Sequence, residues 1–404
     1  MTVTDLPIPC DHARKKRLEI AYSMYFFRMP VKSIRAFASC KGGCGKTTLV
    51  FNVACAYAIK HPGEHVILKD FSETGDLSTL CLGGFMGTAK LGGAGLERAQ
   101  AYSKHQIATI DGLCAAALAA ASAPSGAPFL PIFQRSAAAA PASALQMEGR
   151  LVDIHALNPA MPTNLFIAVT SRDTASNSGF DTPAKRALVK QGLLQFYESD
   201  ARTWTIFIDT DGDRHFTHRT RMGLTLARSV SVPSDINDND AMRMEFFVQG
   251  AQEMAESGEH VPPIDSFILN KVTVVKWEAM NDESKGILSP ITPSKAVSSE
   301  IDRISGQIAA AYCRGGAVEH LPKRFVFPEM AAAGRMASTF GMPVVALKDN
   351  LSSLKSGCKA EGIDLGAFAV SDNLVDAIEE LSIFLEHASM GDSAGTPIKS
   401  RPRQ

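Results

Sequence analysis

The sequence predicts an α/β fold in which helices flank a parallel, doubly wound sheet. Short apolar runs alternate along the chain with longer helical patterns, which is typical of such a sheet. A glycine-rich segment joins the first apolar run to the first helical pattern, and the next run ends at Asp70. Strand, glycine loop, helix and strand in this order form the βαβ unit of a parallel sheet.

The elements follow one another along the chain in a regular order. The first strand is expected at 34–39 and the helix after the glycine loop at 47–60, where Pro62 and Gly63 stop it. A second strand, 66–68, leads to Asp70. The remaining strands are expected at 165–169, 204–208, 230–232, 264–269, 325–327 and 344–347, and the helices at 183–198, 239–256, 294–311, 329–340 and 373–387.

One large domain, 31–387, is expected between two appendages. Residues 1–30 form a basic and aromatic extension, for which a helix packed on the domain is favoured over one that contacts a membrane or nucleic acid. Residues 83–150 are rich in Gly, then in Ala, Ser and Pro, and have little to bury beyond alanine. We therefore expect an insertion of loose helices or disorder there, and a flexible polar tail at 388–404.

Composition limits the classes of function. The 404 residues are 45% hydrophobic and 21% charged, and the formal net charge of −1 provides no overall basic field for nucleic acid. No run reaches the roughly 18 apolar residues of a membrane span. The first ten residues lack the basic region and apolar run of a secretory signal, so a cytoplasmic protein is expected.

The strongest motif is Cys-Lys-Gly-Gly-Cys-Gly-Lys-Thr-Thr at 40–48. It matches the phosphate-binding pattern Gly-x-x-x-x-Gly-Lys-Ser/Thr except at its first position, Cys40. Glycines let backbone N–H groups approach phosphate oxygens. Lys46 is expected to neutralise the β- and γ-phosphates, and Thr47 to ligate Mg²⁺. The nucleotide contacts are expected from Gly42, Gly43, Cys44, Gly45, Lys46, Thr47 and Thr48.

A second lysine, Lys41, opens this loop, and Lys-Gly-Gly-x-Gly-Lys-Thr-Thr resembles the deviant Walker A motif of the ParA/MinD ATPases. The resemblance implies a P-loop NTPase that binds ATP with Mg²⁺ and dimerises with ATP. Lys41 would then reach the nucleotide of the second subunit. It also implies a partner protein that stimulates hydrolysis.

Further segments extend the resemblance over about 31–83 and 150–387. Asp209, after the strand at 204–208, matches the aspartate that holds the water shell of Mg²⁺, and 210–213 occupies the second switch. Asn270 resembles the family's adenine-reading asparagine. Pro328 resembles the start of the loop that lies over the adenine.

The first switch departs from the family pattern. Its segment runs from Asp70 to Asp76, and Ser72 stands where the family has the aspartate that orients the attacking water. A serine hydroxyl is no general base near pH 7. Hydrolysis is therefore expected to be slow or to depend on a partner. The alternatives are that Glu73 or Asp76 substitutes for it, or that the alignment is shifted by one residue and Glu73 takes the catalytic role. The candidate catalytic residues are Lys41, Lys46, Asp70, Ser72 and Glu73.

These observations favour an ATPase that positions or segregates DNA, of the plasmid-partition type. The alternatives are a nucleotide-dependent assembly or regulatory switch with little hydrolysis, and a MinD-like membrane-associated ATPase. Acidic residues of the last helix disfavour an anionic membrane. Candidate DNA contacts are Lys271, Lys276, Trp277, Arg303, Lys323, Arg324 and Arg335. A solvated loop is favoured over a metal site at Asp211, Asp213, His215 and His218.

Overall fold

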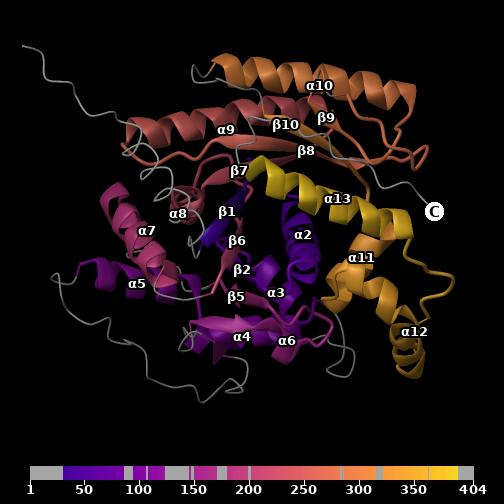
Figure 1. The fold of residues 1–404 in the computed structure, drawn as a ribbon, viewed down its shortest axis with the longest axis horizontal. Helices are drawn as coiled ribbons and strands as arrows, with labels where there is room; N and C mark the ends of the chain where they lie inside the picture. Colours follow the sequence, from indigo (N-terminus) through magenta and orange to yellow (C-terminus); the bar gives the residue numbers. More distant parts are fainter. Residues whose placement is uncertain are drawn as a thin grey trace, which may run out of the picture.

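A computed structural model of the chain describes residues 31–85, 94–105, 108–122, 145–146, 150–170, 180–198, 202–282, 284, 286–314, 322–362 and 364–389. Within these residues, ten strands form one sheet in the order β3-β4-β5-β2-β6-β1-β7-β8-β10-β9. Helices cover both faces of this sheet (Figure 1). The predicted fold class, a doubly wound and mostly parallel α/β sheet with flanking helices, is confirmed.

The strand that precedes the phosphate loop lies inside the sheet. β1 (Val31–Phe37) pairs in parallel with β6 (Trp204–Asp209) on one side and with β7 (Ser229–Asp235) on the other. Only the β3–β4 and β4–β5 pairs are antiparallel among the described ladders. The other strands are β2 (His65–Asp70), β3 (Leu145–Gln146), β4 (Leu151–Asp153), β5 (Leu165–Ala168), β8 (Ile264–Val272), β9 (Ile287–Leu288) and β10 (Lys323–Pro328).

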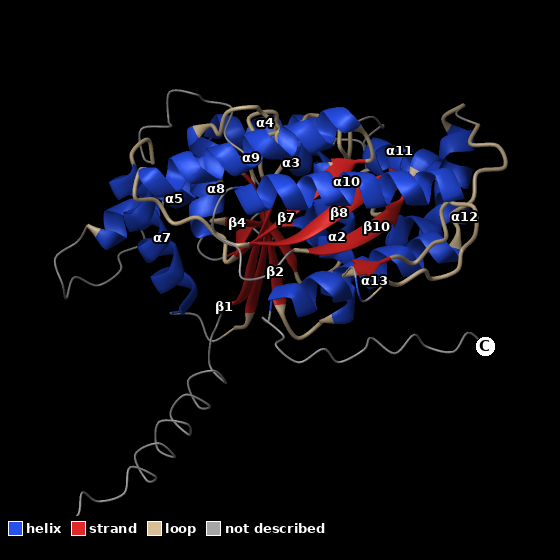
Figure 2. Cartoon of the chain, turned by 90° about the horizontal axis from the view of Figure 1, so that it is seen from above, coloured by secondary structure: helices blue, strands red, loops and turns tan. Residues whose placement is uncertain are grey.

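Alternate residues of the central strands enter two separate cores. Ile206 and Ile208 belong to one core, whereas Phe207 belongs to the other. The first core packs against α5 (Ile110–Ala121), α7 (Pro183–Glu198), α8 (His218–Leu226), α9 (Asp238–Glu256) and α10 (Lys295–Arg314). The second packs against α2 (Lys46–Lys60), α3 (Asp76–Cys81), α4 (Gly95–His105), α6 (Ile154–Leu157), α11 (Ala331–Phe340), α12 (Val344–Ala360) and α13 (Asp372–Ser389). Seen from above, β8 and β10 lie between α10 of the first core and α13 of the second (Figure 2).

One predicted element is wrong. The run 344–347, expected as a strand, begins the helix α12. A short apolar run fits either structure, so its surroundings decide. Pro343 precedes the first turn, and the N–H of Val344 donates to Oδ1 of the buried Asn52 at 2.7 Å. Val344 and Leu347 are both fully buried, at the spacing of one helical turn.

The segment 83–150 holds more core than its composition suggested. α4 and α5 lie within it, and Ile110, Leu113 and Cys114 of α5 are buried in the first core. Thr109 caps α5 by accepting the N–H of Gly112 at 3.1 Å. Other predicted parts, residues 1–30 and nearly all of the tail 388–404, lie outside the described residues.

None of the described helices is both long enough and apolar enough to cross a bilayer.

A buried arginine ties the sheet to the last helix, and this contact gives a stability test. Both Nη atoms of Arg35 donate to the Asp265 carboxylate, at 2.6 and 2.7 Å, and Nη2 also donates to the Leu385 carbonyl at 2.7 Å. We expect Arg35→Met to lower the free energy of unfolding by about 3 kcal/mol, because Asp265 keeps a charge without its counter-ion. Urea unfolding measures this. Adding Asp265→Asn should restore part of the loss, and a double variant as unstable as the single one would contradict this explanation.

Candidate nucleotide site

The phosphate loop connects the end of β1 to the start of α2. Gly43 and Gly45 adopt left-handed conformations with φ of +80° and +81°. Gly45 is the residue before the first turn of α2, which starts at Lys46. The first N–H groups of a helix have no intrahelical acceptor and lie at the positive end of its dipole. The loop therefore presents free amides beside the Lys46 ammonium, as an anion site requires.

An unpaired buried carboxylate lies beside this loop. Asp209 ends β6, and the strand registers place it opposite both Phe37 and Asp70. It is fully buried, and neither carboxylate oxygen has a hydrogen bond of good geometry among the described residues, although the Thr47 side chain lies close enough to lower the Asp209 pKa. Burial raises the pKa of Asp209 to about 7, against the charge of Lys46, which lowers it. A buried carboxylate with open oxygens fits Mg²⁺, and Thr47 and Asp209 would hold the ion.

The neighbouring carboxylate, Asp70, is fully occupied. Its Oδ1 accepts the N–H and the hydroxyl of Ser72, at 3.1 and 2.6 Å. Its Oδ2 accepts the N–H and the hydroxyl of Ser78, at 2.8 and 2.6 Å. Burial raises the pKa of Asp70, and these four bonds oppose the rise. Asp70 therefore fixes the backbone of the first switch through these hydrogen bonds.

The predicted catalytic position, Ser72, is engaged inside the same loop. Its hydroxyl donates to Asp70 and accepts the N–H of Gly75 at 3.1 Å. Glu73 is exposed, and its N–H donates to Oδ1 of Asp211 at 2.8 Å. The two switches are thus joined through Asp211. Burial raises the pKa of Asp211 to about 6, although the Glu73 N–H lowers it.

The second switch lies directly against the phosphate loop. A Cβ built on Gly212 would meet the carbonyl oxygen of Lys41 at 2.4 Å. Only a glycine permits this approach of the two backbones.

A buried series of hydrogen bonds, which no sequence motif predicts, holds the backbone of the first switch in place. The Thr170 hydroxyl donates to the carbonyl of Ser72 at 2.5 Å and accepts from Nη1 of Arg219 at 2.7 Å. Nη2 of Arg219 donates to Asp111 at 2.7 Å. Asp111 belongs to α5, inside the predicted insertion, and so this region supports the site.

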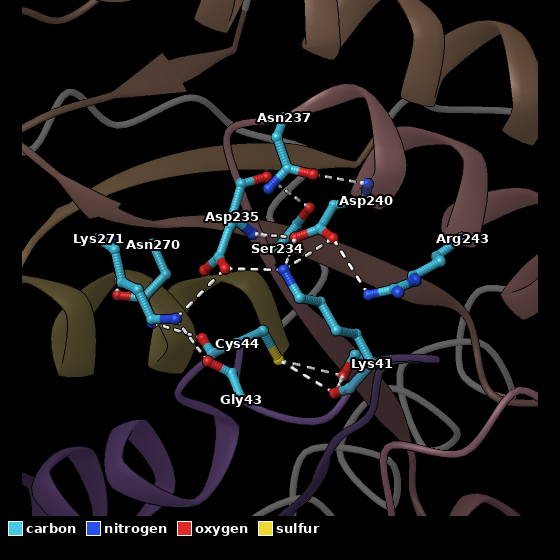
Figure 3. A network of polar contacts seen from close by, with 11 residues as sticks. Lys41, Gly43, Cys44, Ser234, Asp235, Asn237, Asp240, Arg243, Asn270 and Lys271 are labelled. Atoms are coloured by element: carbon cyan, nitrogen blue, oxygen red, sulfur yellow. Dashed lines mark hydrogen bonds and ion pairs between the residues drawn. The ribbon is translucent and has the colours of Figure 1, made fainter.

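The Lys41 ammonium forms ion pairs with two carboxylates of its own chain. Its Nζ lies 2.9 Å from Oδ2 of Asp235 and 2.9 Å from Oδ1 of Asp240 (Figure 3). Burial disfavours the charge of Lys41, but the two carboxylates outweigh it and raise the Lys41 pKa. Neither acidic residue was singled out from the sequence, although Asn237, which caps α9 by accepting the Asp240 N–H, marks this turn.

The predicted base-binding residues lie at the same edge of the sheet. Nδ2 of Asn270 donates to the carbonyl of Cys44 at 2.7 Å. Pro328 is buried at the end of β10, in register with Val272. Thr48 lies in the first turn of α2, and its carbonyl accepts from Nδ2 of Asn52 at 2.8 Å.

The other candidates are dispersed. Among the described residues no group of three or more His, Cys, Asp or Glu side chains could hold a metal ion, so the alternative around His215 and His218 is not supported. Arg303 pairs with Glu300, and burial lowers the pKa of Arg324. The Lys271 ammonium is engaged within the chain, because its Nζ donates to the Gly43 carbonyl and to the Asp235 carboxylate.

No protein-family model matches the chain, and no curated protein matches it. Solved structures similar to it are ATPases of the ParA/MinD type. A ParA family ATPase from Chlorobium tepidum has a TM-score of 0.47 and 14% identity, covering 88% of this chain and 99% of that one. An ATP complex of a McdA variant from Cyanothece has a TM-score of 0.45 and 14% identity, covering 84% and 99%. The septum site-determining protein MinD from Pyrococcus horikoshii, complexed with Mg-ADP, has a TM-score of 0.44 and 15% identity, covering 90% and 99%.

The ParA/MinD ATPases are also the family whose motifs this chain resembles. Their TM-scores lie below 0.5 and their identities are low. At these values the likeness assigns no function to this chain.

Asp209 gives a pH test in the absence of metal. Its folded-state pKa of about 7 exceeds the ordinary 3.8, so the folded protein keeps a proton that the unfolded chain releases. The contribution of Asp209 to stability is then greatest below pH 3.8 and is lost as the pH rises to about 7, by an amount on the order of 4 kcal/mol. We expect Asp209→Asn to remove this loss, so that with EDTA its stabilising effect grows from pH 5 to pH 8 in urea unfolding. Asp213→Asn, at an exposed position, is the control. A less stable Asp209→Asn at pH 8 would refute the assignment.

Proposed function

We propose that this chain is an ATP-binding, ParA-like ATPase that dimerises with ATP and positions or segregates DNA, as in plasmid partition. One observation carries the proposal: a two-lysine phosphate loop lies beside the buried, unpaired carboxylate of Asp209. Such a carboxylate is costly unless a cation accompanies it. The free amides at the start of α2 favour an anion at the same place. Together they favour a phosphate chain that carries its own metal ion.

Different residues of the site would bind the phosphates, the metal ion and the base. The amides of the loop and the Lys46 ammonium would bind phosphate oxygens, while Thr47 and Asp209 would hold Mg²⁺. When bound, Mg²⁺ would neutralise charge on the phosphate oxygens. Asn270 and Pro328, at the ends of β8 and β10, would face the base.

Lys41 supports a role for a second subunit. In the single chain its ammonium pairs with Asp235 and Asp240, so it does not compete with Lys46 for the chain's own nucleotide. A face-to-face second subunit with ATP would offer Lys41 a more strongly charged acceptor than these carboxylates. Dimerisation would then depend on the γ-phosphate.

Slow hydrolysis follows from the first switch. The Ser72 hydroxyl donates to Asp70 and its oxygen accepts the N–H of Gly75, and a serine hydroxyl is no general base for an attacking water. This observation also favours the second candidate, a nucleotide-dependent switch with little hydrolysis. ATP turnover measured with and without double-stranded DNA separates the two. An ATPase of the partition type should be slow alone and faster with DNA or a partner protein, whereas a switch should stay slow in both.

A membrane-associated role receives less support. α13 carries Asp376, Glu379, Glu380 and Glu386, which an anionic lipid surface repels. DNA would have to use local basic residues, because the net charge is −1.

The role of Lys41 has a direct test. We expect wild type to elute as a dimer with Mg²⁺ and a non-hydrolysable ATP analogue, and Lys41→Ala to bind the analogue but remain a monomer. Size-exclusion chromatography with light scattering measures the mass, and calorimetry measures the binding. Lys46→Ala is the matched control, because it should lose most nucleotide affinity. A Lys41→Ala protein that dimerises like wild type would exclude the role across the interface.

A further inference from the structure

A lysine at the end of β8 lies directly behind the phosphate loop. Nζ of Lys271 donates to the carbonyl of Gly43 at 2.5 Å and lies 3.2 Å from Oδ2 of Asp235 (Figure 3). Its backbone has a φ of +60°, a conformation that favours glycine. Residues other than glycine in this conformation cluster at functional sites.

The residue before it makes the neighbouring contact. Nδ2 of the buried Asn270 donates to the carbonyl of Cys44 at 2.7 Å, and its Oδ1 accepts the N–H of Lys271 at 2.9 Å. A Cβ on Gly45 would lie 2.5 Å from this Nδ2. The Asn270 amide therefore packs flat against the loop, and its oxygen and nitrogen are assigned by these partners.

These two donors fix the direction of two peptide planes. In a trans peptide, the carbonyl of one residue and the N–H of the next point in opposite directions, and the described chain has no cis peptide. The carbonyls of Gly43 and Cys44 point toward β8. The N–H groups of Cys44 and Gly45 therefore point away from β8.

We propose that Lys271 and Asn270 are positioning residues that orient the Cys44 and Gly45 amides toward the phosphates of a bound nucleotide. The inference rests on the proposed nucleotide binding and deepens it, because it assigns the preorganised geometry of the loop to residues on a different strand. Asp235 holds the Lys271 ammonium from the opposite side. Preorganised amides bind an anion without reorientation when it arrives.

This role differs from those expected for the two residues. A DNA contact needs the ammonium to face outward, whereas Lys271 directs it at the loop carbonyl. Asn270 keeps a second Nδ2 hydrogen and a second Oδ1 lone pair for an adenine contact, so its bond to Cys44 adds a role to the one expected at the base. Orientation of the loop should affect phosphate binding and leave binding of the base unchanged.

The experiment therefore separates phosphate from base. Calorimetry with Mg-tripolyphosphate, MgATP and adenosine is performed on wild type, Lys271→Met, Lys271→Gly and Lys271→Arg. We expect Lys271→Met and Lys271→Gly to weaken tripolyphosphate and ATP binding by the same factor, about tenfold, because a charged hydrogen bond to the loop is lost. Adenosine binding should not change, and Lys271→Arg should restore most of the affinity. Lys276→Met, an exposed lysine on the following loop, is the control.

Lys271→Gly keeps the test valid if Lys271→Met folds poorly, because glycine adopts a φ of +60° without strain. If wild type binds neither tripolyphosphate nor MgATP, the proposed function fails. If wild type binds both and Lys271→Gly binds tripolyphosphate equally well, the positioning role is wrong. Weaker ATP binding with unchanged tripolyphosphate binding would place Lys271 at the base and also overturn it.

Discussion

Burial of the Asp209 carboxylate is the constraint on which the rest of the site depends. Three parallel strands, β1, β2 and β6, end together, and their register removes Asp209 from water. Its neighbour Asp70 has four hydrogen bonds from Ser72 and Ser78, so none of those donors is available to Asp209. Two buried carboxylates in adjacent strands thus have opposite environments. Asp70 fixes the backbone of a loop, whereas the charged form of Asp209 is costly unless a cation accompanies it, which couples cation binding to stability.

The two switches are not independent loops in this chain. Asp211 of the second switch accepts an N–H of the first, and Gly212 touches the phosphate loop. Behind the first switch, Thr170 and Arg219 lead to Asp111 on α5. Short, buried hydrogen bonds thus connect the first switch to α5 and leave Ser72, Thr170 and Arg219 little room for independent motion.

The local sequence determines the phosphate loop, its flanking strand and helix, and the Asp209 strand, because each needs a fixed order of residue types. The run at 344–347 was ambiguous, since four apolar residues suit a strand or a helix and only Pro343 and Asn52 decide between them. The alanines of α5 favoured loose helices or disorder in this segment. Ile110 and Leu113 nevertheless bury enough apolar surface for α5 to pack on the sheet. Contacts between segments that are distant in the sequence determine the roles of Asp235, Asp240, Arg219 and Lys271. No local pattern encodes such contacts.

The arrangement of charges around Lys41 explains how this lysine could leave its own chain at low cost. If Lys41 moved to the nucleotide of a second subunit, Asp235 and Asp240 would lose a shared cation. Neither would be left alone, because Lys271 lies 3.2 Å from Asp235 and Arg243 lies 3.6 Å from Asp240. An uncompensated, partly buried carboxylate would otherwise hold Lys41 in place. Lys271 thus connects two properties of the loop: the cation that orients its amides also keeps Asp235 neutralised when Lys41 departs.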